Sequence, residues 1–80
     1  MDKFTCNQRD GANVFTLEGR LHFVLPVPHQ TKEFRFSDIG KIVYVECALY
    51  EDPDFLSLIK CEVIDIKRKN NKQYIHAREI

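Results

Sequence analysis

Apolar and polar residues alternate along residues 13–25, which is the period-two pattern of a long strand with one buried face. Gly19 interrupts the apolar face at a position where a side chain is expected. A core-facing glycine lets a long strand bend, so that a small sheet can turn a corner and close on itself. The predicted buried face carries Phe15, Leu17, Leu21, Phe23 and Leu25, and the opposite face carries Thr16, Glu18, Arg20 and His22.

Two further strands follow. The prolines within residues 26–30 end the first strand, and residues 31–37 alternate with Phe34 and Phe36 on one face. A tight turn at 38–40 then leads into residues 42–50, which are apolar at nearly every position. One face of this strand carries Val43, Val45, Cys47 and Leu49, and the other carries Ile42, Tyr44, Ala48 and Tyr50.

Residues 54–68 allow two interpretations. Asp52 followed by Pro53 is a good start for a helix, because it supplies an N-cap acceptor and a proline in the first turn. The β-branched residues 61–67 instead alternate and predict a strand. We favour one long strand from about residue 55 over a single helical turn followed by a strand. The alternation changes phase at Val63 and Ile64, which predicts a β-bulge there.

The C-terminal part of the chain predicts a hairpin. Residues 69–72, Lys-Asn-Asn-Lys, favour a turn because asparagine tolerates positive φ, and residues 72–79 alternate as a last strand. The sequence therefore predicts an all-β fold: a small barrel of five or six antiparallel strands with at most one short helical turn, in a single domain spanning residues 1–80.

Composition narrows the possible classes of protein. Eighty residues bury roughly 60–65% of their surface, so a partner chain or a ligand would add useful stability. The 12 basic and 12 acidic residues cancel, which argues against a protein that coats polyanions by bulk charge but leaves room for a local basic patch. No apolar run reaches the ~18 residues of a membrane span, and residues 1–11 lack the apolar stretch of a signal peptide.

The cysteines and histidines indicate neither a disulfide framework nor a metal site. Cys6, Cys47 and Cys61 are odd in number and widely spaced, so we expect reduced thiols in a cytoplasmic protein. Cys47 and Cys61 fall on apolar strand faces and are predicted to be small core residues. The histidines are scattered and no cysteine pair has metal-ligand spacing, so no metal or cofactor is expected.

Three segments carry a resemblance to a known family: NVFTLEGRL (13–21), DIGKIVYVECAL (38–49) and YIHAREI (74–80). Together they resemble the oligonucleotide/oligosaccharide-binding (OB) fold of bacterial single-stranded-DNA-binding proteins and the related primosomal replication protein. Gly19 stands where the family has a glycine in its first strand, whereas Cys47 stands where the family usually has glycine. The resemblance implies a curved five-stranded barrel, in which one face of each strand lines the interior and the other can bind a ligand or partner.

The outer face of residues 42–50 then has three possible roles. N-terminal residues such as Phe4 could cover it, a partner protein or a second copy could cover it, or nucleotide bases could stack on it. For nucleic acid, stacking on aromatics contributes about 1–3 kcal/mol per base, and a basic hairpin beside the groove supplies charge. The candidate stacking residues are Tyr44, Tyr50 and Tyr74, and the candidate cations are Lys67, Arg68, Lys69 and Lys72.

We favour a protein-interaction subunit or adaptor, with single-stranded nucleic-acid binding as the alternative. Zero net charge, an apolar outer face and a small core are typical of a chain that needs a protein partner. The acidic segment 51–54 and the basic segment 67–72 are expected at opposite ends of the sheet, and such a charge distribution orients a protein partner. We expect no enzyme, because the sequence offers no nucleophile–base pair, glycine-rich phosphate loop or paired carboxylates.

Overall fold

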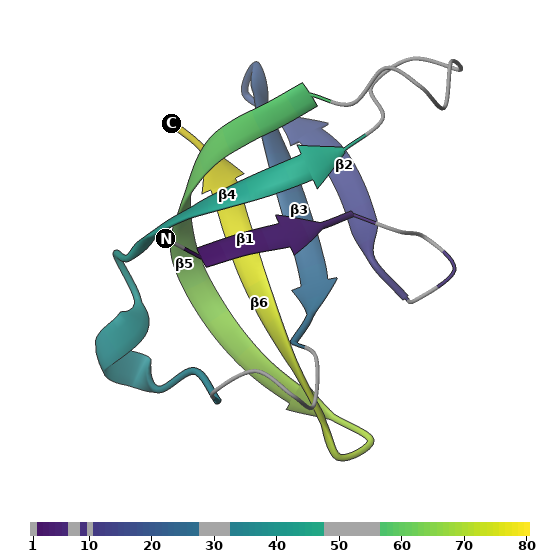
Figure 1. Cartoon of the computed structure of the whole chain (residues 1–80), viewed down its shortest axis with the longest axis vertical. Helices are drawn as coiled ribbons and strands as arrows, with labels where there is room; N and C mark the ends of the chain where they lie inside the picture. The colour runs from purple at the N-terminus through teal and green to yellow at the C-terminus, as the bar shows by residue number, and fades with distance from the viewer. Residues whose placement is uncertain (1, 7–8, 10, 28–32, 48–56) are drawn as a thin grey trace.

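The computed structural model describes residues 2–6, 9, 11–27, 33–47 and 57–80. Within these residues the chain is built from strands, with one 3-10 turn between the third and fourth of them (Figure 1). The all-β prediction is therefore confirmed. The elements are β1 (Asp2–Thr5), β2 (Asn13–Leu17), β3 (Arg20–Pro26), η2 (Phe36–Asp38), β4 (Ile42–Cys47), β5 (Ser57–Lys69) and β6 (Lys72–Glu79).

The strands form one sheet in the order β1-β4-β5-β6-β3-β2. Neighbouring strands are antiparallel except β1 and β4, which are parallel. The prediction of a closed, fully antiparallel barrel is wrong, because closure would require β1 and β2 to pair and they instead form the two edges. The long strand β5 is strongly curved (Figure 1), so the open sheet still wraps around a common core that draws side chains from β1, β3, β4, β5 and β6.

The predicted β-bulge is present in β5. Val63 pairs with Ala77 and Asp65 pairs with His76, so Ile64 is an extra residue between two ladder positions. The bulge moves the apolar residues on either side of it onto one face, and it also increases local bending of the strand. Residues 57–60 are strand rather than helix, and the remainder of the alternative helical turn lies outside the described residues.

Gly19 is part of a β-hairpin turn, which corrects the prediction of one long bent strand. Leu17 pairs directly with Arg20, and Glu18 and Gly19 have φ values of 53° and 78°. Two consecutive positive φ angles are typical of the type I′ turn, whose twist matches that of the flanking strands. Nothing lies within 4 Å of the position of a Cβ on Gly19, so glycine is favoured there by backbone conformation and not by crowding inside a barrel.

This hairpin changes which residues are buried. Phe23 and Leu25 lie in the core as predicted, at 0% and 1% exposure, and Leu21 packs against it. Phe15 and Leu17 were predicted on the same buried face, but they are 39% and 53% exposed. The reason is that Phe15 pairs with His22 and not with a core residue of β3.

Strand β4 has the predicted orientation, but its outer face is not covered as one hypothesis expected. Val43, Val45 and Cys47 are buried, and Tyr44 is half-buried on the opposite face. Phe4 pairs with Val45 along the edge of the sheet and is itself a core residue. The N-terminal strand β1 therefore extends the sheet and does not lie over Tyr44. Leu49 and Ala48 lie outside the described residues.

Residues 33–37 do not form the strand predicted over residues 31–37, of which 31 and 32 lie outside the described residues. They run as an extended segment into η2, and Phe34 is buried whereas Phe36 is 79% exposed. The backbone of Phe34 is held by one side chain: its N–H donates to Gln73 Oε1 at 2.8 Å, and its carbonyl accepts from Gln73 Nε2 at 2.6 Å. Phe34 also packs against Phe4, with ring centroids 5.7 Å apart, so this segment covers one end of the core.

Candidate functional site

The structure does not bring the predicted stacking residues together. Tyr44 lies on β4 opposite Lys60, whereas Tyr74 lies on β6 opposite Lys67. These positions are seven residues apart along β5, which corresponds to roughly 20 Å. Tyr50, the third predicted residue, lies outside the described residues. Tyr44 and Tyr74 are therefore separate surface features and not one platform.

The predicted cations Lys67, Arg68, Lys69 and Lys72 do share one end of the molecule. They flank the hairpin between β5 and β6, where Asn70 and Asn71 have the positive φ values expected of the turn. Lys69 and Lys72 are paired directly across the ladder, an arrangement in which like charges repel. The hairpin end is consequently a basic surface that would be stabilised by a bound anion.

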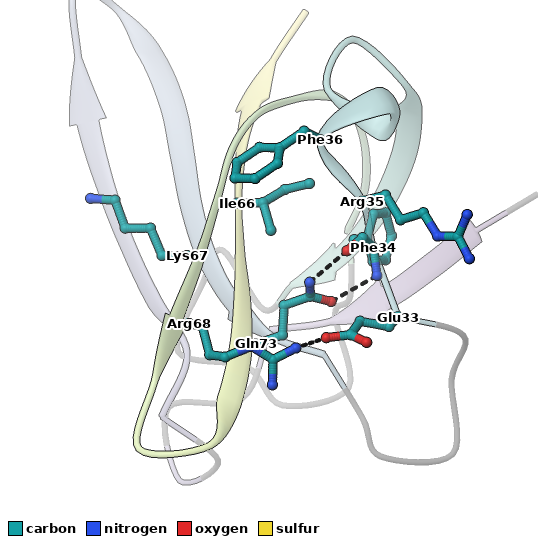
Figure 2. A pocket seen from close by; sticks show the side chains of 8 residues that line it. All are labelled: Glu33, Phe34, Arg35, Phe36, Ile66, Lys67, Arg68 and Gln73. Carbon is teal, nitrogen blue, oxygen red and sulfur yellow. Dashed lines mark hydrogen bonds and ion pairs between the residues drawn. The ribbon is translucent and has the colours of Figure 1, made fainter.

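A cleft of about 230 Å³ lies beside this basic hairpin. Figure 2 shows residues 33–36 on one side of it and the end of the β5–β6 hairpin on the other. The Gln73 amide fixes the first side in place through its two hydrogen bonds to Phe34 (Figure 2). The lining residues are Glu33, Phe34, Arg35, Phe36, Ile66, Lys67, Arg68 and Gln73.

The cleft combines an aromatic ring with an excess of positive charge. The exposed Phe36 and the apolar Ile66 both line the cleft, and its charged lining residues are three cations and one carboxylate, Glu33. In Figure 2 the Arg68 side chain meets Glu33, whereas the side chains of Arg35 and Lys67 point away from Phe36 and Ile66. Glu33 forms an ion pair with Arg68, and both side chains are more than half exposed. Exposed ion pairs contribute little to stability, so Arg68 can exchange Glu33 for another anion at small cost.

Sequence reasoning did not find Phe36 as a candidate site residue. Alternation predicted that Phe36 shares one strand face with Phe34. The contrary signal is Asp38, whose carboxylate accepts a hydrogen bond from the Arg35 backbone N–H at 2.8 Å. Such local side-chain hydrogen bonds compete with strand pairing, and here they accompany the 3-10 turn that presents Phe36 outward.

A second cluster lies on the outer face of β2, β3 and β6. His22 Nδ1 and His76 Nε2 are 2.9 Å apart, so one ring nitrogen donates the shared proton and the other accepts it. Phe15 stacks on His22 with centroids 5.1 Å apart and an interplanar angle of 13°. Burial lowers the pKa of His76 from its usual value, and the neighbouring His22 lowers it further, against an opposing effect of Asp65.

Because of this histidine pair, we expect the folded chain to lose stability in mild acid. A histidine whose pKa is lowered by folding stabilises the protein while it is neutral, and that contribution is lost as the pH falls through the ordinary histidine value near 6.5. We expect the wild-type thermal midpoint to fall between pH 7.5 and about pH 5.5. His76→Gln retains hydrogen-bonding groups but cannot be protonated in this range, so its midpoint should change less. Equal pH dependence in both proteins would show that the pair does not control acid stability.

Comparisons with known proteins do not extend this picture: no family model, no curated protein and no solved structure matches the chain. Among the described residues, no helix is long and apolar enough to cross a membrane. The same part of the chain contains no group of three or more histidine, cysteine, aspartate or glutamate side chains that could hold a metal ion. The function must therefore be argued from the surface features themselves.

Proposed function

We propose that the chain is a protein-interaction module that binds an extended segment of its partner along the edge of β2. One observation carries this proposal. Strand β2 is an edge strand, and in the described part of the chain it pairs with β3 alone. Its sequence, Asn-Val-Phe-Thr-Leu, contains no charge and no proline. Native proteins usually protect exposed edges with charges, prolines or bulges, so an unprotected edge favours strand addition by a partner.

The register of the β2–β3 hairpin shows which backbone groups are available. In a two-residue hairpin the pair next to the turn, here Leu17 and Arg20, exchanges both hydrogen bonds, and bonded and non-bonded pairs then alternate. Val14 and Thr16 therefore direct their N–H and C=O groups away from β3. An added strand can pair with these groups, while the exposed side chains of Phe15 and Leu17 offer apolar contacts that give specificity.

The opposite edge of the sheet is different. Strand β1 has the sequence Asp-Lys-Phe-Thr, and Lys3 forms an ion pair with Glu46 on the neighbouring strand β4. Charged side chains on an edge disfavour pairing with another chain. The contrast between the two edges supports β2 as the docking edge, because the charged side chains of β1 disfavour addition of another strand there.

Thr16→Pro is expected to weaken partner binding with little change in the fold. Proline removes the outward N–H of residue 16 and places a ring on the open edge, a position where proline is tolerated within a sheet. Peptides selected from a displayed library for binding to the wild-type chain should lose at least about tenfold in affinity for this variant, since one hydrogen bond and close backbone approach are lost. Thr16→Val retains the N–H and should bind like the wild type.

Hydrogen exchange supplies the decisive readout for this edge. The amides of Val14 and Thr16 should exchange quickly in the free chain and become protected when the selected peptide is bound. The same measurement over a concentration series tests whether a second copy of the chain occupies the edge. Equal peptide affinity for Thr16→Pro, together with protection that maps to another surface, would refute docking at β2.

A second candidate function, binding of single-stranded nucleic acid, is favoured by the cleft beside the basic hairpin. Phe36 offers an exposed ring on which a base can stack, and Arg35, Lys67 and Arg68 line the same cleft. Aromatic stacking combined with backbone neutralisation is the general mode of single-strand binding. The neutral overall charge makes this the weaker candidate, because only one end of the molecule would attract a polyanion.

A further inference from the structure

Two of the three cysteines lie side by side at the β1 end of the sheet. Phe4 pairs with Val45 and Thr5 with Glu46 in the parallel β1–β4 ladder, so Cys6 is the next residue alongside Cys47. The Cys6 N–H continues the ladder, donating to the Glu46 carbonyl at 2.9 Å. The two thiols share the core side of the sheet and are in hydrogen-bonding contact with each other.

The backbone spacing of this pair is compatible with a disulfide. Neighbouring strands are about 4.8 Å apart, which falls inside the range of Cα–Cα separations that disulfides span. Neither residue is part of a disulfide in this structure. Cys6 is half-buried whereas Cys47 and Cys61 are buried, so among the three Cys6 is the most accessible residue to a reagent in solution.

We propose that Cys6 and Cys47 form a redox modification site. A low-molecular-weight disulfide such as oxidised glutathione oxidises the two thiols, and the product is an intramolecular disulfide between Cys6 and Cys47. The Cys6 thiolate attacks one sulfur of the reagent, and one molecule of reduced glutathione leaves. Cys47 then attacks the Cys6 sulfur of the mixed disulfide and releases the second molecule of reduced glutathione. Two thiols lose two hydrogens in total, and the reagent gains both.

The bond would fix the N-terminal edge strand. Strand β1 has four residues and forms ladder pairs with β4 alone among the described strands. A covalent link between residues 6 and 47 closes a long loop, and closing a long loop restricts the unfolded chain strongly. Oxidation therefore converts a short edge strand into a permanently attached one, while β2, at the other edge of the sheet, remains open.

The environment of Cys6 sets the conditions for this reaction. Burial raises the pKa of the Cys6 thiol to about 11, and the neighbouring Cys47 raises it in the same direction. Because the thiolate is the attacking species, disulfide formation should be slow near neutral pH. Its rate should increase about tenfold for each unit by which the pH rises toward the Cys6 pKa. Cys6 would accordingly respond to sustained oxidation and not to brief exposure.

The test begins with the purified, reduced full chain incubated with oxidised glutathione. Trypsin places the three cysteines on three different peptides, residues 4–9, 42–60 and 61–67. Mass spectrometry without reduction should show the first two peptides joined in a monomeric protein that has lost two hydrogens. Dimers joined through Cys6, a stable glutathione adduct on Cys6 alone, or any bond to Cys61 would overturn the proposal.

Two serine variants provide the controls. Cys61 of β5 pairs with Val43 of β4, which is four residues from Cys47 along that strand, a separation of roughly 13 Å. Cys61→Ser should therefore oxidise like the wild type. Oxidation should raise the thermal midpoint of both proteins by about 5 °C or more. Cys6→Ser should form no intramolecular bond and show no rise. An unchanged or lower midpoint in the oxidised wild type would refute the role of the bond in fixing β1.

Discussion

Replacing Phe23 with alanine is expected to remove a large share of the free energy of unfolding of the chain. The side chain is 0% exposed and lies between Val14 on β2 and Ala77 on β6. Truncating a buried phenylalanine costs about 3–5 kcal/mol, whereas the total stability of an 80-residue domain is about 4–12 kcal/mol. The loss should appear as a large fall in the urea midpoint followed by far-ultraviolet circular dichroism.

Phe15→Ala is the matched control for this prediction. The same atoms are removed from the neighbouring strand, but Phe15 is on the outer face and is 39% exposed. We expect a cost of about 1 kcal/mol, mainly from lost contact with the two histidines. Equal losses for Phe15→Ala and Phe23→Ala would contradict the hairpin and would instead favour one long strand with both rings in the core.

That long strand was predicted because a two-residue hairpin leaves the alternation of the sequence unbroken. Two turn residues continue the apolar–polar sequence pattern while the chain reverses, and each residue of β2 then pairs with a β3 residue of opposite parity, such as Phe15 with His22. Alternation alone therefore cannot separate a hairpin from a bent strand. Turn chemistry separates them only where the residues are distinctive, and Glu18-Gly19 is a weaker signal than Asn-Gly.

Other features were predictable because their local signals were distinctive. The change of phase at Val63 and Ile64 has few explanations other than a bulge, and the bulge lies there. Asn70 and Asn71 tolerate positive φ, and both adopt it. The inward face of β4 also followed from alternation, since β4 is an uninterrupted strand.

The pairing of strands that are distant in the sequence could not be predicted from such local signals. The parallel contact of β1 with β4 joins residues about forty positions apart, and no short pattern in the sequence specifies such a partner. Consequently the open edge at β2 and the adjacent thiols of Cys6 and Cys47 could not be predicted, although each residue involved is visible in the sequence. The cleft was missed for a related reason, because it depends on Gln73 holding the backbone of a segment 39 residues away.

The cleft gives the last prediction, on the second candidate function. If a base stacks on Phe36, Phe36→Ala should weaken binding of a fluorescent oligothymidine about 5–150-fold, since one stacked base contributes about 1–3 kcal/mol. Tyr44→Ala is the control, because Tyr44 lies on β4, away from the cleft. The affinity of this variant for the oligonucleotide should equal that of the wild type. Fluorescence anisotropy at several salt concentrations measures both variants.

Charge in the same cleft should appear in the salt dependence. Each phosphate contact to a single strand contributes about 0.7 to the slope of log affinity against log salt concentration, so Lys67→Gln combined with Arg68→Gln should flatten the slope by about 1.4. If Tyr44→Ala weakens binding as much as Phe36→Ala, the cleft is not the site. If the wild-type chain binds no oligonucleotide even at low salt, nucleic-acid binding is refuted, while docking at β2 is unaffected because the open edge strand and the cleft are built from different residues.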